Sequence, residues 1–341
     1  MPASEFDLIA AINERLPAPS ERVRVPSGDD AAVVEGDPPS VVSVDAIVDG
    51  VHFALEAFGA EAVGRKALAA GLSDLAAMGA APGEAYVVVG APAEMPDEQL
   101  LEMADGLAGV ATRDHVSIAG GDLVSSPVLV VCVTAIGYEP DAARLVGRGG
   151  ASPGDAVAVT GELGGAAAAL SLLGIGEGDQ DQTRSAVPPQ LRESLLARQL
   201  DPRPRLREGR ALAAAGASAM IDVSDGLGAD GGHVARSSGC RLEIDAGRVP
   251  VAAGVTAIAG GDGPALELAT SGGEDYELLI AIPPERLAEA RKAAATAGGT
   301  TLTEIGYVTE GQGVALRLPG GGEIAPRGFD QRRGSRSGSA G

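Results

Sequence analysis

The pattern of hydrophobic and polar positions in the first half of the chain predicts helices and strands in alternation. Leu68, Leu72 and Leu75 recur at helical spacing within a longer pattern, which predicts a helix over about Ala60–Met78. Val-rich segments predict strands before and after this helix. The other elements expected here are a helix opening at Ser4–Asp7, strands at Ala31–Val34, Ser40–Val48 and Tyr86–Val89, a helix at Pro96–Thr112, and strands at Val116–Ala119 and Val128–Ile136 separated by Gly120-Gly121-Asp122.

The second half repeats this alternation after a Gly/Pro break, GRGGASPGD, around Arg148. We therefore expect two mixed α/β domains, residues 1–145 and 146–330, followed by a disordered tail over 331–341 that is rich in Gly, Ser and Arg. A polar stretch at Gly174–Gln190 is expected to be a flexible loop. The regular elements expected here are strands at Ala156–Thr160, Ala219–Val223, Glu277–Ile282 and, as the last one, Thr301–Val308, with helices at Pro189–Arg198, from Gly226, and at Pro284–Ala297.

Composition and charge exclude several classes of function. The chain has 26 basic and 47 acidic residues, a net charge of −21, so we expect neither nucleic acid nor a membrane as a partner. Cys132 and Cys240 lie far apart without CxxC spacing, which excludes a disulfide scaffold and fits a cytoplasmic protein. The N-terminus has no basic signal-peptide region, and the longest apolar run, Val128–Gly137, is too short to cross a bilayer.

Several aspartates stand in neutral surroundings, with no Lys or Arg within four positions. Asp74 is the sharpest case, because the predicted helix places it on an apolar patch with Ala70 and Met78, where an unpaired carboxylate is costly. Carboxylate oxygens are the ligands that Mg²⁺ and Ca²⁺ prefer, whereas any single Asp can instead cap a helix or turn. The residues of this kind are Asp29, Asp30, Asp45, Asp74, Asp122, Asp222 and Asp225.

The sequence motifs of several other enzyme classes are missing from the chain. There is no Gly-Lys pair, which excludes a Walker A loop, and HExxH does not occur. The three histidines, His52, His115 and His233, are scattered, and of these only His52 lies near an acidic segment. Metal-assisted chemistry on oxygen ligands is therefore the reading that the residues favour.

The order of motifs along the chain resembles thiamine-monophosphate kinase. The matching segments are SEFDLI, GDDAAVV, VDAIVDGVHF, KALAAGLSDLAAMGA, AGGD, GRGGASPGD with VAVTG, IDVSDGL, SGGEDYELL and RGFD. The resemblance implies the fold of the superfamily that includes aminoimidazole ribonucleotide synthetase, with an N-terminal α/β domain that pairs in a homodimer. It also implies an enzyme that uses ATP and several Mg²⁺ ions to convert thiamine monophosphate to thiamine diphosphate.

The resemblance also implies a role for each residue that matches a motif. Gly121, Asp122, Arg148 and Ser224 would bind ATP, and His52, Glu274 and Phe329 would bind the thiamine phosphate. No side chain would act as a general base, whereas Asp222, Asp225 and Arg148 would support an in-line transfer. The metal ligands would be Asp30, Ser43, Val44 (through its carbonyl), Asp45, Asp74, Asp122, Asp222 and Asp225.

The chain departs from the family pattern at three places: Val44 replaces a common Thr, Gly71 a frequent Asn, and Arg113 or Asp114 an aromatic residue beside the adenine. Metal cations and a guanidinium would make so acidic a protein attractive to anionic substrates.

Within the superfamily, selenophosphate synthetase is disfavoured because no Cys precedes Cys132, and a hydrogenase maturation protein because the chain ends in SGSAG. The alternatives left are aminoimidazole ribonucleotide synthetase and, from another class, a non-catalytic Mg²⁺- or Ca²⁺-binding protein, which has no need of Arg148, Glu274 and Phe329.

Overall fold

The computed structural model describes residues 23–25, 31–36, 38–175, 185, 187–318, 320–324, 327–330 and 335–336. The helix expected from Ser4 and the candidate ligands Asp29 and Asp30 lie outside these ranges, as does most of the polar stretch after Gly174. Of the segment 331–341, the structure describes residues 335 and 336 alone.

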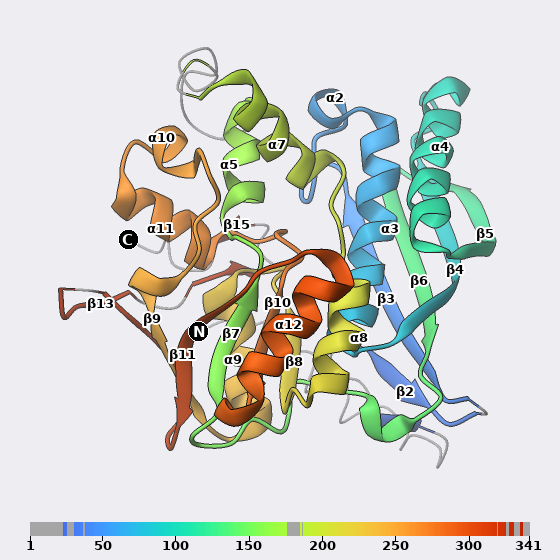
Figure 1. Cartoon of the computed structure of the whole chain (residues 1–341). Helices are drawn as coiled ribbons and strands as arrows, with labels where there is room; N and C mark the ends of the chain where they lie inside the picture. Colours follow the sequence, from blue (N-terminus) through green and yellow to red (C-terminus); the bar gives the residue numbers. More distant parts are fainter. Residues whose placement is uncertain are drawn as a thin grey trace, which may run out of the picture.

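A mixed sheet forms the first half of the described chain (Figure 1). Its strands are β1 (Val23–Val25), β2 (Ala32–Val34), β3 (Ser40–Val48), β4 (Ala81–Ala91), β5 (Ser117–Ser125) and β6 (Val130–Tyr138). The order is β1-β2-β3-β6-β4-β5, antiparallel throughout except for the parallel pair of β4 and β5. Along β3 and β6, successive side chains point to a buried face and to a more exposed face of the sheet in turn. This alternation is expected of a sheet that is covered on one face only.

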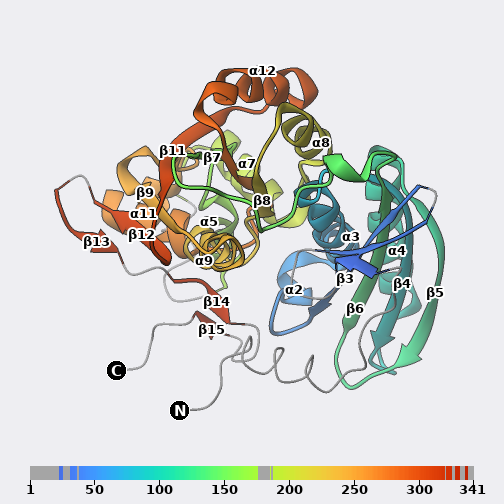
Figure 2. The same ribbon diagram turned by 90° about the horizontal axis from the view of Figure 1, so that it is seen from below.

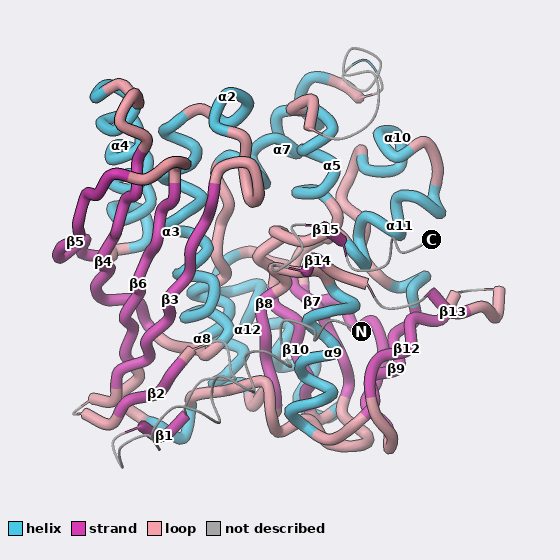
Figure 3. The backbone as a smooth tube through the Cα atoms, turned by 180° about the vertical axis from the view of Figure 1, so that it is seen from behind, coloured by secondary structure: helices cyan, strands magenta, loops and turns pink. Residues whose placement is uncertain are grey.

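Helices cover one face of this sheet, and the other face is turned toward the viewer in Figure 3. The helices are α2 (Leu55–Phe58), α3 (Ala60–Ala77) and α4 (Asp97–Asp114). Helix α3 packs on β3 and β6 and against α4. A Cβ at Gly106 would lie 1.9 Å from the carbonyl oxygen of Glu61, so this glycine allows the backbones of α3 and α4 to touch.

The second half of the described chain builds a sheet of order β13-β12-β9-β11-β7-β10-β8, in which only β12 and β9 run parallel. Its strands are β7 (Ala156–Thr160), β8 (Ala219–Asp222), β9 (Arg241–Asp245), β10 (Leu278–Ile282), β11 (Leu302–Thr309), β12 (Gly313–Arg317) and β13 (Glu323–Ile324). Its helices are α5 (Gly165–Leu172), α7 (Pro189–Leu200), α8 (Leu206–Ala215), α9 (Leu227–Ser238), α10 (Val255–Ala259), α11 (Asp262–Ser271) and α12 (Leu287–Gly298).

Helix α3 joins the two halves, because it also packs against α8 and β8 of the second (Figure 2). A Cβ at Gly209 of α8 would lie 2.0 Å from the carbonyl oxygen of Ala76, so the two helices meet backbone to backbone. One aliphatic core extends across this contact, from Leu72 on α3 to Leu212 on α8. Helix α3 is buried on nearly all sides for this reason.

The predicted mixed α/β architecture is confirmed, and two local expectations are wrong. Gly120-Gly121-Asp122 lies inside β5 and does not separate two strands. A Cβ at Gly121 would approach the Val87 carbonyl oxygen to 2.1 Å, so glycine permits close pairing at this edge. The second error concerns the end of the fold, where β12 and β13 follow β11. Across the described ranges, no helix has both the length and the apolarity that a bilayer crossing needs.

Candidate active site

A cavity of about 670 Å³ opens where α3 and β3 of the first half meet the loops of the second half. Its size is within the range of small-molecule sites. Most of the residues that the sequence analysis singled out line it. They are Val44, Asp45, His52, Asp74, Asp222, Ser224, Asp225, Glu274 and Phe329, together with Ser271 and Tyr276.

Strand β3 and helix α3 supply the acidic groups of the first half. Asp45 interrupts β3, and burial is the main reason that its pKa is raised. Ser43, two residues earlier on the same face of β3, donates a hydrogen bond from its hydroxyl to the carboxylate of Asp74 on α3. The two predicted ligands Ser43 and Asp74 are thus in direct contact.

The loop after β8 supplies the acidic groups of the second half. The Ser73 hydroxyl of α3 donates a 2.7 Å hydrogen bond to Asp222 at the end of β8. The buried carboxylate of Asp230 accepts hydrogen bonds from the amides of residues 224, 225 and 226, at 2.9–3.1 Å. This carboxylate therefore holds the Ser224-Asp225 turn that lines the cavity.

Glu274 enters the cavity from the loop between α11 and β10, with a left-handed backbone (φ 66°). Its Oε1 is 2.6 Å from Nζ of the fully buried Lys66, and its Oε2 accepts a 2.7 Å hydrogen bond from Gln199. A Cβ on the neighbouring Gly273 would lie 2.2 Å from the Ser224 carbonyl oxygen. The two loops of the second half are therefore in close backbone contact beneath the cavity.

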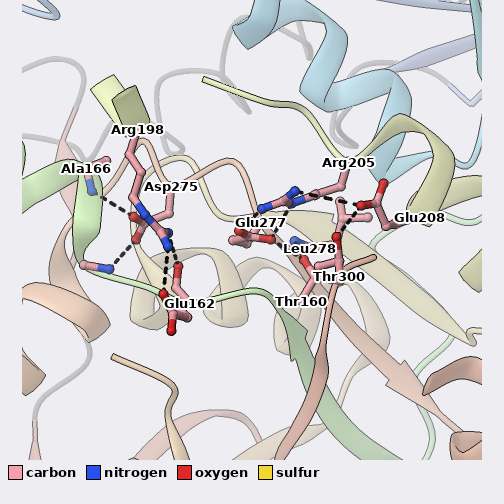
Figure 4. A network of polar contacts seen from close by, with 11 residues as sticks. Thr160, Glu162, Ala166, Arg198, Arg205, Glu208, Asp275, Glu277, Leu278 and Thr300 are labelled. Atoms are coloured by element: carbon pink, nitrogen blue, oxygen red, sulfur yellow. Dashed lines mark hydrogen bonds and ion pairs between the residues drawn. The ribbon is translucent and has the colours of Figure 1, made fainter. Parts of the chain in front are cut away.

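The residues that follow Glu274 anchor this loop to other elements (Figure 4). Asp275 accepts hydrogen bonds from the amides of Gly164 and Ala166 at the start of α5. Burial raises the pKa of Asp275 to about 7, although these amides oppose the shift. Glu277 is bound by the Arg205 guanidinium and by the Thr160 hydroxyl, the latter at 2.7 Å.

Tyr276 is buried among the acidic residues of the cavity. Burial raises its pKa well above the usual value, and the negative charges of Glu274, Asp45, Asp222 and Asp74 add to that shift. Its backbone is also left-handed (φ 49°). Strained backbone of this kind gathers at binding sites, where the surrounding structure holds it in place.

An aromatic pair lines the same cavity. The rings of His52 and Phe329 have centroids 6.1 Å apart and are tilted by 55°. The amide of Val48 donates to Nδ1 of His52, which leaves Nε2 as the N–H side of the neutral ring. Phe329 is held beside the acidic loop because its amide donates a 3.0 Å hydrogen bond to the Asp225 carbonyl.

The donor set of the cavity fits a hard divalent cation. It consists of carboxylate and hydroxyl oxygens, the chemistry that Mg²⁺ prefers. In the described part of the chain, no three His, Cys, Asp or Glu side chains form a ready metal-binding group. The Ser271 hydroxyl is buried at the cavity and, as far as the chain is described, has no hydrogen-bond partner. An unsatisfied buried hydroxyl there is consistent with a site shaped for a ligand.

Gly121, Asp122 and Arg148 are not among the residues that line this cavity. Asp45 on β3 pairs with Val133 on β6, which pairs with Val87 on β4, which pairs with Gly121 on β5. Three strand spacings, about 14 Å in total, therefore separate Gly121 from Asp45. Asp122 follows on the opposite face. Arg148 lies in the connection between the sheets, where its carbonyl oxygen accepts a hydrogen bond from Ser238 of α9.

Four residues of the site were not predicted from the sequence: Lys66, Gln199, Asp230 and Tyr276. A signal for Lys66 was available, because Lys66, Ala70 and Asp74 follow one another at four-residue spacing and share one side of α3. The buried Asp230 gave none, since an Asp early in a helix is common. Gln199 and Tyr276 act through tertiary contacts that no local pattern encodes.

Comparison with known proteins places these residues in a family. Residues 28–138 match the N-terminal domain of AIR synthase related proteins, and residues 152–319 match the C-terminal domain. A thiamine-monophosphate kinase of Mycobacterium tuberculosis is 42% identical over 74% of this chain and 73% of its own length. That of Caulobacter vibrioides is 37% identical over 94% and 88%. The structure described as "AaThiL complexed with AMPPCP and TMP" aligns with a TM-score of 0.80 and 31% identity over 96% of each chain. The chain therefore belongs to the thiamine-monophosphate kinase family of AIR synthase related proteins.

Proposed function

We propose that the protein transfers the γ-phosphoryl group of ATP to the phosphate of thiamine monophosphate, giving thiamine diphosphate and ADP. The observation that carries this proposal is that acidic residues of both halves and the His52–Phe329 pair line one cavity. A solved relative carries the ATP analogue AMPPCP and TMP, which supports these two substrates. A non-catalytic metal-binding protein needs neither the aromatic pair nor Glu274.

The acidic residues would hold Mg²⁺. Asp45, Asp74, Asp222 and Asp225 are the candidates in the cavity, with Ser43 and the carbonyl of Val44 beside them. Asp30 and Asp122 remain candidates by resemblance. When bound, the metal would neutralise the negative charges of the triphosphate and of the acceptor. Ser43 and Ser73 orient the carboxylates of Asp74 and Asp222 for this task through their hydrogen bonds.

The transfer itself requires no protein base. An oxygen of the acceptor phosphate forms a bond to the γ-phosphorus, the bond to the β,γ-bridging oxygen breaks, and ADP leaves with that electron pair. A phosphate monoester has a second pKa near about 6, so at neutral pH the acceptor is mostly deprotonated already. The residues of the cavity therefore act by positioning and by charge balance.

The proposed substrate contacts follow the cavity wall. Phe329 and His52 would contact the apolar and cationic thiazolium, and Glu274 would face the N–H groups or the positive charge of the thiamine moiety. Ser224 would contact ATP from the turn that Asp230 holds. Arg148 would reach ATP from beside α9, whose preceding loop carries Ser224 and Asp225.

We further propose that two copies pair through the open face of the first sheet. The large side chains exposed there include Val44, Tyr86 and Val88, which are 65%, 40% and 42% exposed. Val44 also lines the cavity, so β3 contributes to both the cavity and this face. Pairing would cover the apolar surface and bring β5, with Gly121 and Asp122, toward the cavity of the partner.

The two free thiols, Cys132 and Cys240, support a cytoplasmic location.

The test is a product assay with ATP, Mg²⁺ and thiamine monophosphate, analysed by chromatography and phosphorus NMR. We expect thiamine diphosphate and ADP in equal amounts, no net inorganic phosphate, and no product when a chelator replaces Mg²⁺. Hydrolysis of ATP to ADP and inorganic phosphate without thiamine diphosphate would contradict the proposal. Chelator-insensitive transfer would contradict the role of the metal.

A further inference from the structure

A buried ion pair connects the two halves of the protein behind the cavity. Lys66 of α3 is fully buried, and its Nζ lies 2.6 Å from Oε1 of Glu274 and 2.8 Å from Oε1 of Gln199. The Nζ also lies 5.6 Å from the centroid of the Phe58 ring. Lys66 and Gln199 are both absent from the cavity lining, whereas Glu274 is part of it.

Gln199 completes the arrangement from α7. Its Oε1 accepts from Lys66, and its Nε2 donates to Oε2 of Glu274 at 2.7 Å and to the carbonyl of Ala166 at 3.2 Å. The amide orientation of Gln199 is thus determined by a donor on one side and two acceptors on the other. Each oxygen of the Glu274 carboxylate receives one hydrogen bond or ion pair from the protein side.

The Glu274 backbone is held as firmly as its side chain. Its φ of 66° is a left-handed conformation that a glutamate rarely adopts, and its amide donates a 2.8 Å hydrogen bond to the Ser224 carbonyl. Lys66 and Gln199 approach from behind the cavity wall, and the Glu274 side chain is 22% exposed. Each carboxylate oxygen has two lone pairs, so, among the residues that the structure describes, one on each oxygen remains for a ligand.

We propose that Lys66 and Gln199 are positioning residues that hold Glu274 in place as a carboxylate for the thiamine moiety of the acceptor. The buried ammonium pairs with one carboxylate oxygen of Glu274 and the Gln199 amide with the other, and the two contacts fix the plane of the carboxylate. The groups recognised are cationic or N–H-bearing heterocycles, not the phosphates, which Glu274 would repel. This inference rests on the proposed function, because thiamine monophosphate carries such heterocycles.

The experiment compares Lys66→Met with Arg65→Met in steady-state kinetics. Arg65 is the neighbouring cation on α3, and it also contacts α7, through the Leu200 carbonyl at 2.9 Å, but it does not line the cavity. For Lys66→Met we expect the KM for thiamine monophosphate to rise at least about tenfold, the size of a lost charge-assisted contact. The KM for ATP and kcat should change by less than about threefold, and Arg65→Met should leave all three parameters near those of the wild type.

A double-mutant cycle with Glu274→Gln tests whether Lys66 acts through Glu274. We expect the double variant to resemble Glu274→Gln alone within about threefold, because the Lys66 contact has no further route to the substrate. Multiplying effects, or equal increases in both KM values, would overturn the inference. If Lys66→Met does not fold, Gln199→Met removes one donor and leaves the ion pair, and its KM for thiamine monophosphate should still rise selectively.

The failure of this inference is distinguishable from failure of the proposed function. Calorimetric titration of thiamine monophosphate into each variant gives the same comparison without turnover. A wild-type protein that binds thiamine monophosphate but forms no thiamine diphosphate would overturn the proposed reaction alone. Wild-type binding that Lys66→Met and Gln199→Met leave unchanged would overturn the positioning role alone, and a wild type that does not bind would overturn both.

Discussion

The Ser73 hydroxyl of α3 donates a hydrogen bond to the carboxylate of Asp222, with 2.7 Å between the two oxygens. This bond crosses the contact between the two halves of the protein. Both side chains are buried, and Ser73 immediately precedes Asp74. One helix of the first half therefore holds an acidic residue of the second half and contributes its own next to it. The acidic wall of the cavity thus depends on the packing of α3 against β8 and α8.

Phe329→Ala tests the aromatic wall of the cavity. We expect the KM for thiamine monophosphate to rise at least about tenfold, because apolar contact and cation–π attraction to the thiazolium are lost, while the KM for ATP changes little. Tyr307→Ala is the control, since Tyr307 is 57% exposed on β11 and does not line the cavity. Equal effects of Phe329→Ala on both substrates would assign Phe329 to packing alone.

His52→Ala tests the absence of a protein base. We expect weaker binding of thiamine monophosphate but a kcat within about tenfold of the wild type, because the acceptor phosphate needs no deprotonation. The acidic limb of kcat/KM should move with the second pKa of a phosphonate analogue of the acceptor. A limb that ignores the analogue and disappears in His52→Ala would identify His52 as a base. His115→Ala, at an exposed position outside the cavity, is the control.

Val88→Asp tests the pairing face. Val88 shares a row of the sheet with Cys132 and Asp122, on the open face, so a carboxylate there should oppose burial against a second copy. In sedimentation analysis we expect the wild type to be dimeric and Val88→Asp to shift toward monomer. Leu101→Asp, at a 66% exposed position of α4, should leave the dimer intact. A wild-type monomer, or a variant that stays dimeric, would count against this face.

His233 predicts a pH dependence of stability. Burial, and then Arg148 and Arg236, lower its pKa from 6.5 to about 4. The folded state thus binds a proton at His233 less tightly than the unfolded chain does. The stability that the folded protein gains from neutral His233 is therefore fully present above about pH 6.5 and is lost as the pH falls toward 4. At about 1.4 kcal/mol per pKa unit, the lowered pKa of His233 corresponds to at most about 3.5 kcal/mol of unfolding free energy.

The measurement for His233 is calorimetric unfolding of His233→Gln between pH 7 and pH 5. We expect the variant to lose less Tm than the wild type over this range, because Gln takes up no proton. His115→Gln, at its exposed position, should follow the wild type. Parallel losses of Tm in all three proteins would show that His233 does not carry the acid sensitivity.

Local pattern was sufficient for most regular elements. The leucine spacing of α3, the Val-rich strands and the neutral surroundings of Asp45, Asp74 and Asp222 are all visible along the chain. The break expected at Gly120-Gly121-Asp122 failed because glycine was read as a turn signal, whereas Gly121 serves close strand pairing in β5. The same residue type thus has opposite meanings, and only the neighbouring strand decides between them.

The supporting contacts of the site could not be read in the same way. Lys66 meets Glu274 and Gln199, which lie far along the chain, and the charge of Lys66 gave no sign of its partner. Asp230 lies in the first turn of α9, and nothing in its sequence context shows that its carboxylate binds the amides of the preceding loop. Contacts of this kind depend on how the two halves pack, which the order of motifs does not specify.

Asp74→Asn is the sharpest test of whether phosphoryl transfer occurs in the acidic cavity. The variant keeps the size and the hydrogen bond partner Ser43 but removes the charge that a divalent cation would require. We expect an unchanged fold and at least about a 100-fold loss of Mg²⁺-dependent thiamine diphosphate formation, whereas Asp105→Asn, on the exposed side of α4, retains full activity. Activity of Asp74→Asn within a few-fold of the wild type would contradict the account.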